Sequence, residues 1–188
     1  MVVDPFALLG VPRSFDLDVG QIEARWRDVS RAVHPDRHLN AGASDRRQAI
    51  AKAMDVNEAF RTLKDPIRRG EALVRLAAGA AGAAPGPEPA ADMELLMSVM
   101  ELRGALGVAR AARDLVAIRD ATSQVQALAA TVTGEASRAL AAVVAAPDPA
   151  GLALATKALG KLRYYRRFLD EAQAIADDLA DAAGESAP

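Results

Sequence analysis

The chain has 188 residues, of which 51% are hydrophobic and only 4% aromatic, and its formal net charge is −2. It contains no cysteine, which excludes disulfides, thiolate zinc sites, cysteine-ligated iron–sulfur clusters and thiol catalysis. The slightly negative charge argues against general nucleic-acid binding. No stretch is expected to reach the roughly 20 apolar residues of a membrane span. We therefore expect a soluble, cytoplasmic, all-α protein.

The first predicted helix is short and has clear signals at both ends. Asp4 supplies an N-cap acceptor, Pro5 occupies the first helical position, and Gly10 ends the helix. The same Asp-Pro pair recurs at residues 65–66 and 148–149, where it predicts two further helix starts.

Two longer helices are predicted next. Asp18 and Gln21 resemble a capping box and open a helix that runs to about residue 33. A third helix, with Ser44 as its N-cap, runs to about residue 64. Each has an inner apolar stripe, and the two stripes are expected to face each other. The stripes are Ile22, Trp26, Val29 and Val33 on the second helix, and Ala49, Ala53, Val56, Phe60 and Leu63 on the third.

A domain boundary is predicted at residues 77–91, where three glycines and three prolines accompany no bulky side chain. Before it, residues 66–76 continue as helix. The charge balance also changes, because Lys and Arg outnumber Asp and Glu by 13 to 11 over residues 1–76 but are outnumbered by 14 to 10 over residues 77–188. The sequence therefore predicts a first domain over residues 1–76, a linker over residues 77–91, and a second domain over residues 92–184.

The second domain is predicted to be a bundle of three antiparallel helices, at about residues 92–110, 113–145 and 149–182. Gly134 is expected to interrupt the middle helix. The last helix has an apolar seam with the spacing of a bundle. Its members are Ala155, Leu159, Leu162, Tyr165, Leu169, Ala172, Ala176 and Leu179.

The bundle helices have more apolar residues than one seam requires. On the first helix, the stripe assigned to the bundle is Leu95, Val99, Leu102 and Leu106. A second stripe on that helix is Met93, Met97 and Met100, with Leu96 at its edge. On the last helix, Tyr164, Phe168 and Ile175 lie off the seam. The spare stripes form either an exposed binding patch, which suits methionine, or the core of a wider bundle, and periodicity alone does not separate the two.

The tripeptide His34-Pro35-Asp36 lies at the tip between the second and third helices. Pro35 disfavours helix at His34, so the second helix must end there. The spacing of His34, Asp36 and His38 superficially resembles that of metal ligands, but the proline breaks the helix that would align the two histidines, and no further clear ligand is near. A His–Asp enzyme would need a nucleophile and a pocket, and neither is visible.

A contact site for another protein is the reading that the context of this tip favours. A basic helix face containing Arg25, Arg27 and Arg31 leads directly to the tip, and Arg37 extends it. The alternative is that these arginines form an ordinary solvated surface.

Residues 5–76 resemble a J-domain, the module by which co-chaperones stimulate ATP hydrolysis by DnaK-type chaperones. The resemblance rests on the segments PFALLG, WRDVSRAVHPDR and VNEAFRTLKDP. The whole chain resembles the HscB family of co-chaperones in iron–sulfur cluster biogenesis, through IRRGEALVRL, LLMSVMELRGAL and KLRYYRRFLDEA. This resemblance implies an L-shaped two-domain protein with no enzymatic activity, catalytic residue, resident metal or cofactor.

The resemblance also implies two binding sites. The contacts of an HscA- or DnaK-type chaperone fall on His34, Pro35 and Asp36, supported by Arg25, Arg31 and Arg37. The contacts of the cluster scaffold protein IscU fall on Leu96, Met97, Met100, Glu101 and Tyr164. Gly104 stands where the family commonly has an acidic residue, and Tyr164 where phenylalanine is familiar. The alternatives are a J-domain co-chaperone with a different client and a helical His/Asp enzyme.

Overall fold

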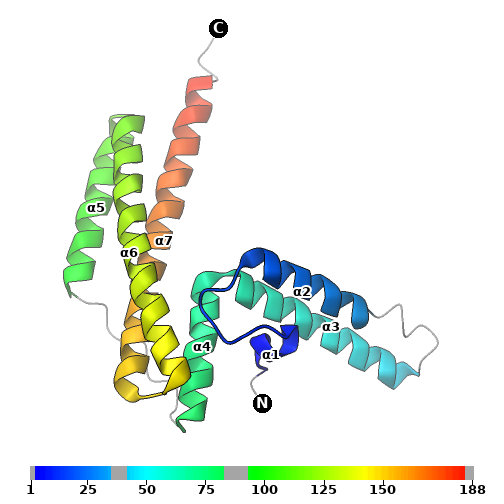
Figure 1. Cartoon of the computed structure of the whole chain (residues 1–188). Helices are drawn as coiled ribbons and strands as arrows, with labels where there is room; N and C mark the ends of the chain where they lie inside the picture. The colour runs from blue at the N-terminus through cyan, green and yellow to red at the C-terminus, as the bar shows by residue number, and fades with distance from the viewer. Residues whose placement is uncertain (1–2, 35–41, 83–92, 185–188) are drawn as a thin grey trace. The chain divides into compact units, whose positions relative to one another are not determined.

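The structure, a computed structural model, describes residues 3–34, 42–82 and 93–184 (Figure 1). Across these ranges every regular element is an α-helix, which confirms the all-α prediction. The helices are α1 (Pro5–Leu9), α2 (Val19–Ala32), α3 (Ala43–Lys64), α4 (Pro66–Ala80), α5 (Met93–Ala111), α6 (Leu115–Ala145) and α7 (Pro149–Gly184).

Aspartate side chains begin most of these helices. A carboxylate oxygen accepts hydrogen bonds from backbone N–H groups of the first turn at 2.8–3.2 Å, which satisfies donors that have no partner inside the helix. The capping residues are Asp4, Asp18, Asp65, Asp114 and Asp148. The predicted helix starts at the three Asp-Pro pairs and at Asp18 are therefore confirmed.

Two local details differ from the sequence-based expectation. The N-cap of α3 is Gly42, and the prediction of Ser44 was wrong. Because α3 begins at Ala43, the backbone of Ser44 is already helical and cannot adopt the extended conformation of an N-cap. Gly134 does not interrupt α6, which is continuous from Leu115 to Ala145.

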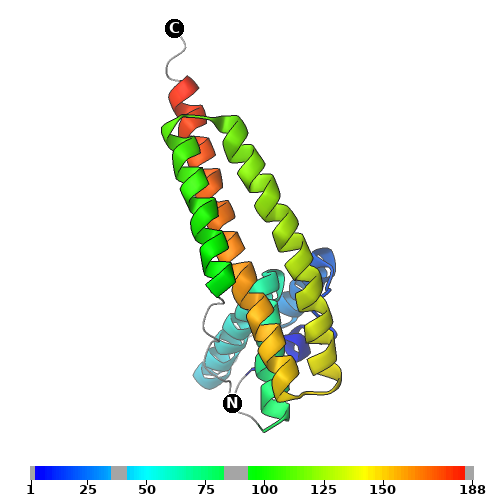
Figure 2. The same cartoon turned by 90° about the vertical axis from the view of Figure 1, so that its left-hand side faces the viewer.

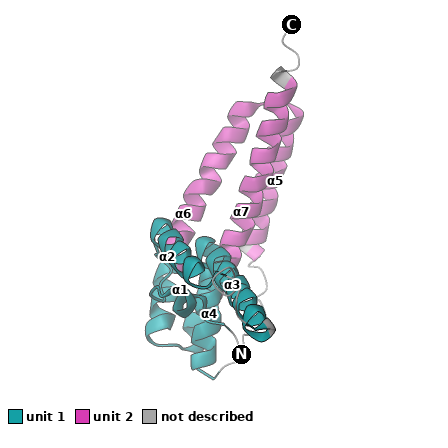
Figure 3. Ribbon diagram, turned by 90° about the vertical axis from the view of Figure 1, so that its right-hand side faces the viewer, with its two compact units in different colours: residues 1–85, 137–155 teal, residues 86–136, 156–188 magenta. Residues whose placement is uncertain are grey.

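The chain forms two compact units that are each discontinuous in sequence (Figure 3). One comprises residues 1–85 and 137–155, and the other comprises residues 86–136 and 156–188. The first unit therefore includes the end of α6 and the start of α7 as well as α1 to α4. The predicted linker begins inside α4, and its part from residue 83 onward lies outside the described residues.

In the first unit, α2 and α3 pack against each other, and α1 and α4 also contact α3. The predicted facing stripes meet: the rings of Trp26 and Phe60 stack with centroids 4.5 Å apart. The indole N–H of Trp26 donates a 3.0 Å hydrogen bond to Asn57. Ile22 and Val56 are completely buried in the same interface. These contacts fix the two helices that lead to and from the segment containing His34.

A buried arginine anchors the segment between α1 and α2. The side chain of Arg69, on α4, is 4% exposed and donates to the carbonyl oxygens of Phe15 and Leu17 at 2.8 and 2.9 Å. Burial lowers the pKa of Arg69, while the negative charges of Asp16 and Asp65 act in the opposite direction. Asp16, in the same segment, accepts a hydrogen bond from Ser137 in the part of α6 that belongs to this unit.

The second unit contains α5, most of α6 and most of α7. The predicted bundle stripe of α5 is buried at Leu95, Val99 and Leu106. On α7, Phe168 and Ile175 are 1% and 6% exposed, so for these two residues the alternative of a wider bundle core is the correct one. The reason is that α7 belongs to a three-helix bundle, in which a helix packs against two neighbours and buries a wider arc than a single seam.

Helix α6 is long and apolar enough, by length and composition alone, to cross a membrane. It has 31 residues, and an 18-residue window within it has a mean hydropathy of 1.2. The expectation that no stretch approaches a membrane span was therefore wrong by this criterion. A single helix of this kind is weak evidence, because a bundle helix has the same pattern. The helix buries Ile118, Val125 and Val132 at the seven-residue spacing of a bundle seam.

Candidate partner-binding surfaces

The first candidate surface lies at the C-terminal end of α2. The helix ends at Ala32, and His34 follows it with an exposed side chain. Pro35, Asp36 and Arg37, the rest of the predicted chaperone contact, lie outside the described residues. Of the predicted tripeptide, the structure therefore describes His34. It follows the end of α2, a helix that packs against α3 through the stacked rings of Trp26 and Phe60.

The two predicted basic residues on α2 have different surroundings. Arg31 is exposed and forms an ion pair with Asp28, one helical turn earlier, with 2.6 Å between Nη2 and Oδ1. Arg25 donates to the carbonyl oxygen of Gly10 at 3.2 Å. Gly10 has a φ of 64°, and a Cβ atom there would lie 2.5 Å from the Arg25 guanidinium. Arg25 thus also links α2 to the end of α1, whereas the described partner of Arg31 lies on its own helix.

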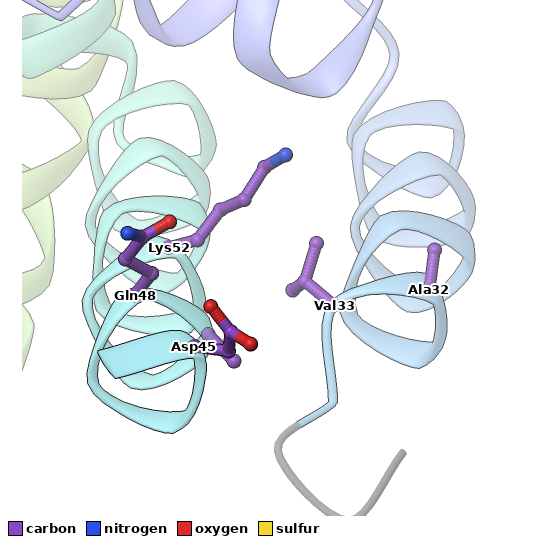
Figure 4. A pocket seen from close by; sticks show the side chains of 6 residues that line it. Ala32, Val33, Asp45, Gln48 and Lys52 are labelled. Atoms are coloured by element: carbon purple, nitrogen blue, oxygen red, sulfur yellow. The ribbon is translucent and has the colours of Figure 1, made fainter. Parts of the chain in front are cut away.

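A hollow of about 440 Å³ separates the end of α2 from the start of α3 (Figure 4). Ala32 and Val33 line its α2 side, and the α3 side is polar, with Lys52 reaching toward α2. The other lining residues are Asp45, Gln48 and Ala49. The hollow adjoins His34 and gives this end of the helix pair a concave, mixed polar and apolar surface.

The second candidate surface is the methionine patch on α5, comprising Met93, Met97 and Met100 with Leu96 at its edge. The three methionines are 70%, 58% and 72% exposed, whereas Leu96 is half-buried. Leu95 and Val99, on the other stripe of the same helix, are 8% and 6% exposed. The methionines are therefore surface residues, and the alternative that they form the core of a wider bundle is excluded for α5.

Helix α7 adjoins this patch and runs parallel to α5 (Figure 2). Arg103 pairs with Glu171 at 3.3 Å, and Arg110 pairs with Asp178 at 3.9 Å. Arg110 and Asp178 of the second pair lie seven residues, or one heptad, beyond Arg103 and Glu171 of the first pair. In each pair the two residues are 68 positions apart in sequence. The same offset puts the half-buried Tyr164 at the level of Leu96.

The predicted scaffold-binding residues thus occupy neighbouring parts of two helices. Leu96 and Tyr164 lie where α5 and α7 meet, and the exposed Met97 and Met100 continue the surface across α5. Glu101 is also exposed. By the helical spacing, Glu101 and Arg103 lie on opposite sides of the methionine stripe of α5. The ion pairs that set this register were not anticipated, because the sequence pattern does not reveal which arginine of α5 faces which carboxylate of α7.

These surfaces have the chemistry of protein contacts. Among the described residues, no group of three His, Asp or Glu side chains is arranged to hold a metal ion. An exposed patch of flexible, polarisable methionines suits an apolar partner whose shape varies, and an exposed basic helix end suits an acidic one.

Comparisons with known proteins match the two parts of the chain to two family models. Residues 4–71 match the family model of the DnaJ domain, and residues 91–173 match the model described as the HSCB C-terminal oligomerisation domain. A co-chaperone protein HscB homolog from Shewanella oneidensis is 31% identical over 176 residues, which cover 94% of this chain and 98% of the relative. A homolog from Ralstonia nicotianae is 38% identical over 115 residues, but these span only 64% of that relative and 61% of this chain.

Two solved structures are similar over most of the chain. The chaperone HscB from Vibrio cholerae has a TM-score of 0.78 and 27% identity, and the match covers 94% of this chain and 99% of that one. The human co-chaperone protein HscB has a TM-score of 0.76 over 92% of this chain and 82% of its own, and at 24% identity it bears on the fold alone.

Proposed function

This chain belongs to the HscB family of co-chaperones, and from that premise we propose that it stimulates the ATPase of an HscA- or DnaK-type chaperone and delivers an IscU-type iron–sulfur scaffold to it. The family itself is one of J-domain proteins without enzymatic activity, which act with an Hsp70-type chaperone. The choice of chaperone, the scaffold and the delivery step are the parts that we propose.

The observation that carries the proposal is the exposure of the methionine patch. Met93, Met97 and Met100 are 58–72% exposed on a helix that has already buried its other apolar stripe. Their solvent-exposed apolar area is available to a partner, and burying it on binding provides the main driving force. Leu96 and Tyr164, both half-buried at the junction of α5 and α7, extend the same apolar surface.

We propose that the N-terminal site acts on the chaperone through His34, Pro35 and Asp36, with Arg25, Arg31 and Arg37 as basic support. Positive charges on this surface attract an acidic patch of the chaperone and accelerate association. A proline in the contact segment restricts the backbone before binding, so less conformational entropy is lost when the complex forms. Binding in this mode favours the chaperone state that hydrolyses its own ATP.

The two sites work together because one chain carries both. A scaffold held on the methionine patch is brought to the chaperone at a high effective concentration. ATP hydrolysis then tightens the grip of the chaperone on the scaffold and aids release of the iron–sulfur cluster, which is cargo in this scheme. Because the chaperone consumes ATP, we propose that the protein acts in the cytoplasm.

The decisive experiment measures the steady-state ATPase rate of the chaperone with this protein, with the scaffold, and with both together. Coupling predicts that the two together stimulate the rate more than the product of their separate effects. Stimulation by this protein alone, with no further effect of the scaffold and no scaffold binding in a pulldown, would instead indicate a J-domain co-chaperone with a different client.

A further inference from the structure

The charges on α7 are sharply segregated along the helix. Residues 157–167 contain five basic residues and no acidic one, whereas residues 170–181 contain five acidic residues and no basic one. The basic segment surrounds Tyr164, so it lies beside the proposed scaffold site. It also holds half of the ten basic residues in the otherwise acidic C-terminal part of the chain, residues 77–188.

The acidic segment is largely engaged within the bundle. Glu171 and Asp178 pair with arginines of α5, and Asp177 accepts a hydrogen bond from Gln173. In the basic segment, by contrast, neither Lys161 nor Arg167 forms an ion pair with any of the residues that the structure describes. Arg167 is exposed and Lys161 is half-buried, so both charges remain available at the surface.

The register between α5 and α7 sets the axial level of these two charges relative to the methionine patch. With the offset of 68 residues, Lys161 lies at the same height along the bundle as Met93. Arg167 lies at the height of Val99, one residue before Met100. Residues three apart lie on neighbouring rows of a helix, so Lys161 and Arg167 lie on opposite sides of Tyr164. Arg167 is one turn before Glu171, which faces α5, whereas Lys161 lies on the same face as the buried Tyr165 and Phe168.

The charge around the patch is therefore asymmetric. The exposed Arg167 lies on its α7 side, and the acidic Glu101 lies on the opposite side of the methionines. Gly104, one turn further along α5, contributes no charge. A polar rim of this kind favours one orientation of a partner, because juxtaposing like charges costs binding energy.

We propose that Arg167 forms a basic rim of the methionine patch and contacts acidic side chains of the scaffold protein. This inference rests on the proposed function, and it adds the chemistry of the partner: an apolar ridge with carboxylates along the edge that faces α7. The apolar patch supplies most of the affinity, and the rim sets the association rate and the orientation.

The test compares charge reversals at matched positions of the same bundle. Arg167→Glu reverses a basic charge beside the patch, while Arg119→Glu makes the same change at an exposed position on α6. Binding of a purified IscU-type scaffold is measured at low and high salt, with the association rate recorded separately. Circular dichroism verifies that each variant is folded.

We expect Arg167→Glu to weaken binding about three- to tenfold at low salt, chiefly through slower association, and much less at high salt. Arg119→Glu should bind like the parent. Arg167→Gln should lie between the parent and Arg167→Glu, because it removes the attraction without adding a repulsion.

Unchanged binding by Arg167→Glu, in a protein whose Met97→Ala variant loses the scaffold, would overturn this inference and leave the proposed function intact. Tighter binding by Arg167→Glu would overturn it too, because the partner would then be basic at this edge. If the parent protein does not bind the scaffold at either salt concentration, the proposed function and the basic rim both fail.

Discussion

The guanidinium of Arg69 donates a 2.8 Å hydrogen bond to the carbonyl oxygen of Phe15, 54 positions earlier in the chain. It also donates to the carbonyl oxygen of Leu17 at 2.9 Å, and the arginine is only 4% exposed. One side chain of α4 therefore satisfies two backbone acceptors of the segment that joins α1 to α2. Without it, this irregular segment would have to bury those carbonyl groups without partners.

Arg69→Met should destabilise the protein by about 2–4 kcal/mol, because it leaves two backbone carbonyl groups without their buried donor. The free energy of unfolding in urea measures this loss. Arg68→Met is the matched control, since Arg68 is exposed on the same helix, and it should change stability by no more than about 0.5 kcal/mol. Equal stability of the two variants would show that the Arg69 contacts do not hold the segment.

His34→Gln should abolish stimulation of the chaperone ATPase while leaving helicity and scaffold binding unchanged. The side chain of His34 is exposed at the end of α2, so its replacement should disturb no core packing. The measurement is the ATPase rate at saturating co-chaperone, with a scaffold pulldown as the control. Normal stimulation by this variant would show that the proposed chaperone site is not where the reaction is controlled.

Arg31→Glu should weaken chaperone binding and flatten its dependence on salt, because it removes an attraction that dissolved ions screen. Arg61→Glu is the matched control: Arg61, on α3, is exposed and pairs with Glu58 three residues earlier, just as Arg31 pairs with Asp28. Binding is measured over a range of salt concentrations. If both reversals leave the salt slope at the parental value, Arg31 belongs to an ordinary solvated surface.

Met97→Ala and Leu162→Ala should have opposite effects. Met97 is 58% exposed, so its truncation should barely change the melting temperature but should weaken scaffold binding about tenfold or more if it anchors the contact. Leu162 is 7% exposed on α7, and its truncation should cost about 2–5 kcal/mol of stability. Thermal unfolding and scaffold affinity are measured for both. A Met97→Ala protein that melts early and still binds when folded would refute the patch assignment.

Tyr165→Phe should change how stability depends on alkaline pH. Burial raises the pKa of the Tyr165 phenol, and the negative charge of Glu135 raises it further. In the unfolded chain the phenol ionises near pH 10, whereas the folded protein keeps it neutral to higher pH. Its contribution is therefore fully present below about pH 10 and is lost as the pH rises above that value, with a slope of up to about 1.4 kcal/mol per pH unit.

Urea unfolding of the parent and of Tyr165→Phe between pH 7 and 11 tests this expectation. The difference in unfolding free energy between the two proteins should be constant at neutral pH and should shift in favour of the phenylalanine variant at the alkaline end. Parallel curves over the whole range would mean that the phenol ionises equally easily in the folded and unfolded states.

The helix starts could be predicted from the sequence because capping is a local interaction. An aspartate such as Asp65 reaches N–H groups only two or three residues further along the chain, and the following proline already favours the first helical position. For the same reason, Asp4 and Gly10 were sufficient to define both ends of α1. The segment at His34, as a break between two patterned helices, is also a local signal.

Which apolar residues become surface was decided only by the tertiary structure. Met97 and Phe168 both lie off the seam predicted for their helix, yet the first is 58% exposed and the second 1%. Periodicity records that a face is apolar, but burial depends on how many neighbouring helices cover that face. Arg69 illustrates the same limit, because its acceptors belong to residues more than fifty positions away. Local chemistry therefore determined the elements, and contacts between distant segments determined which side chains remain available to a partner.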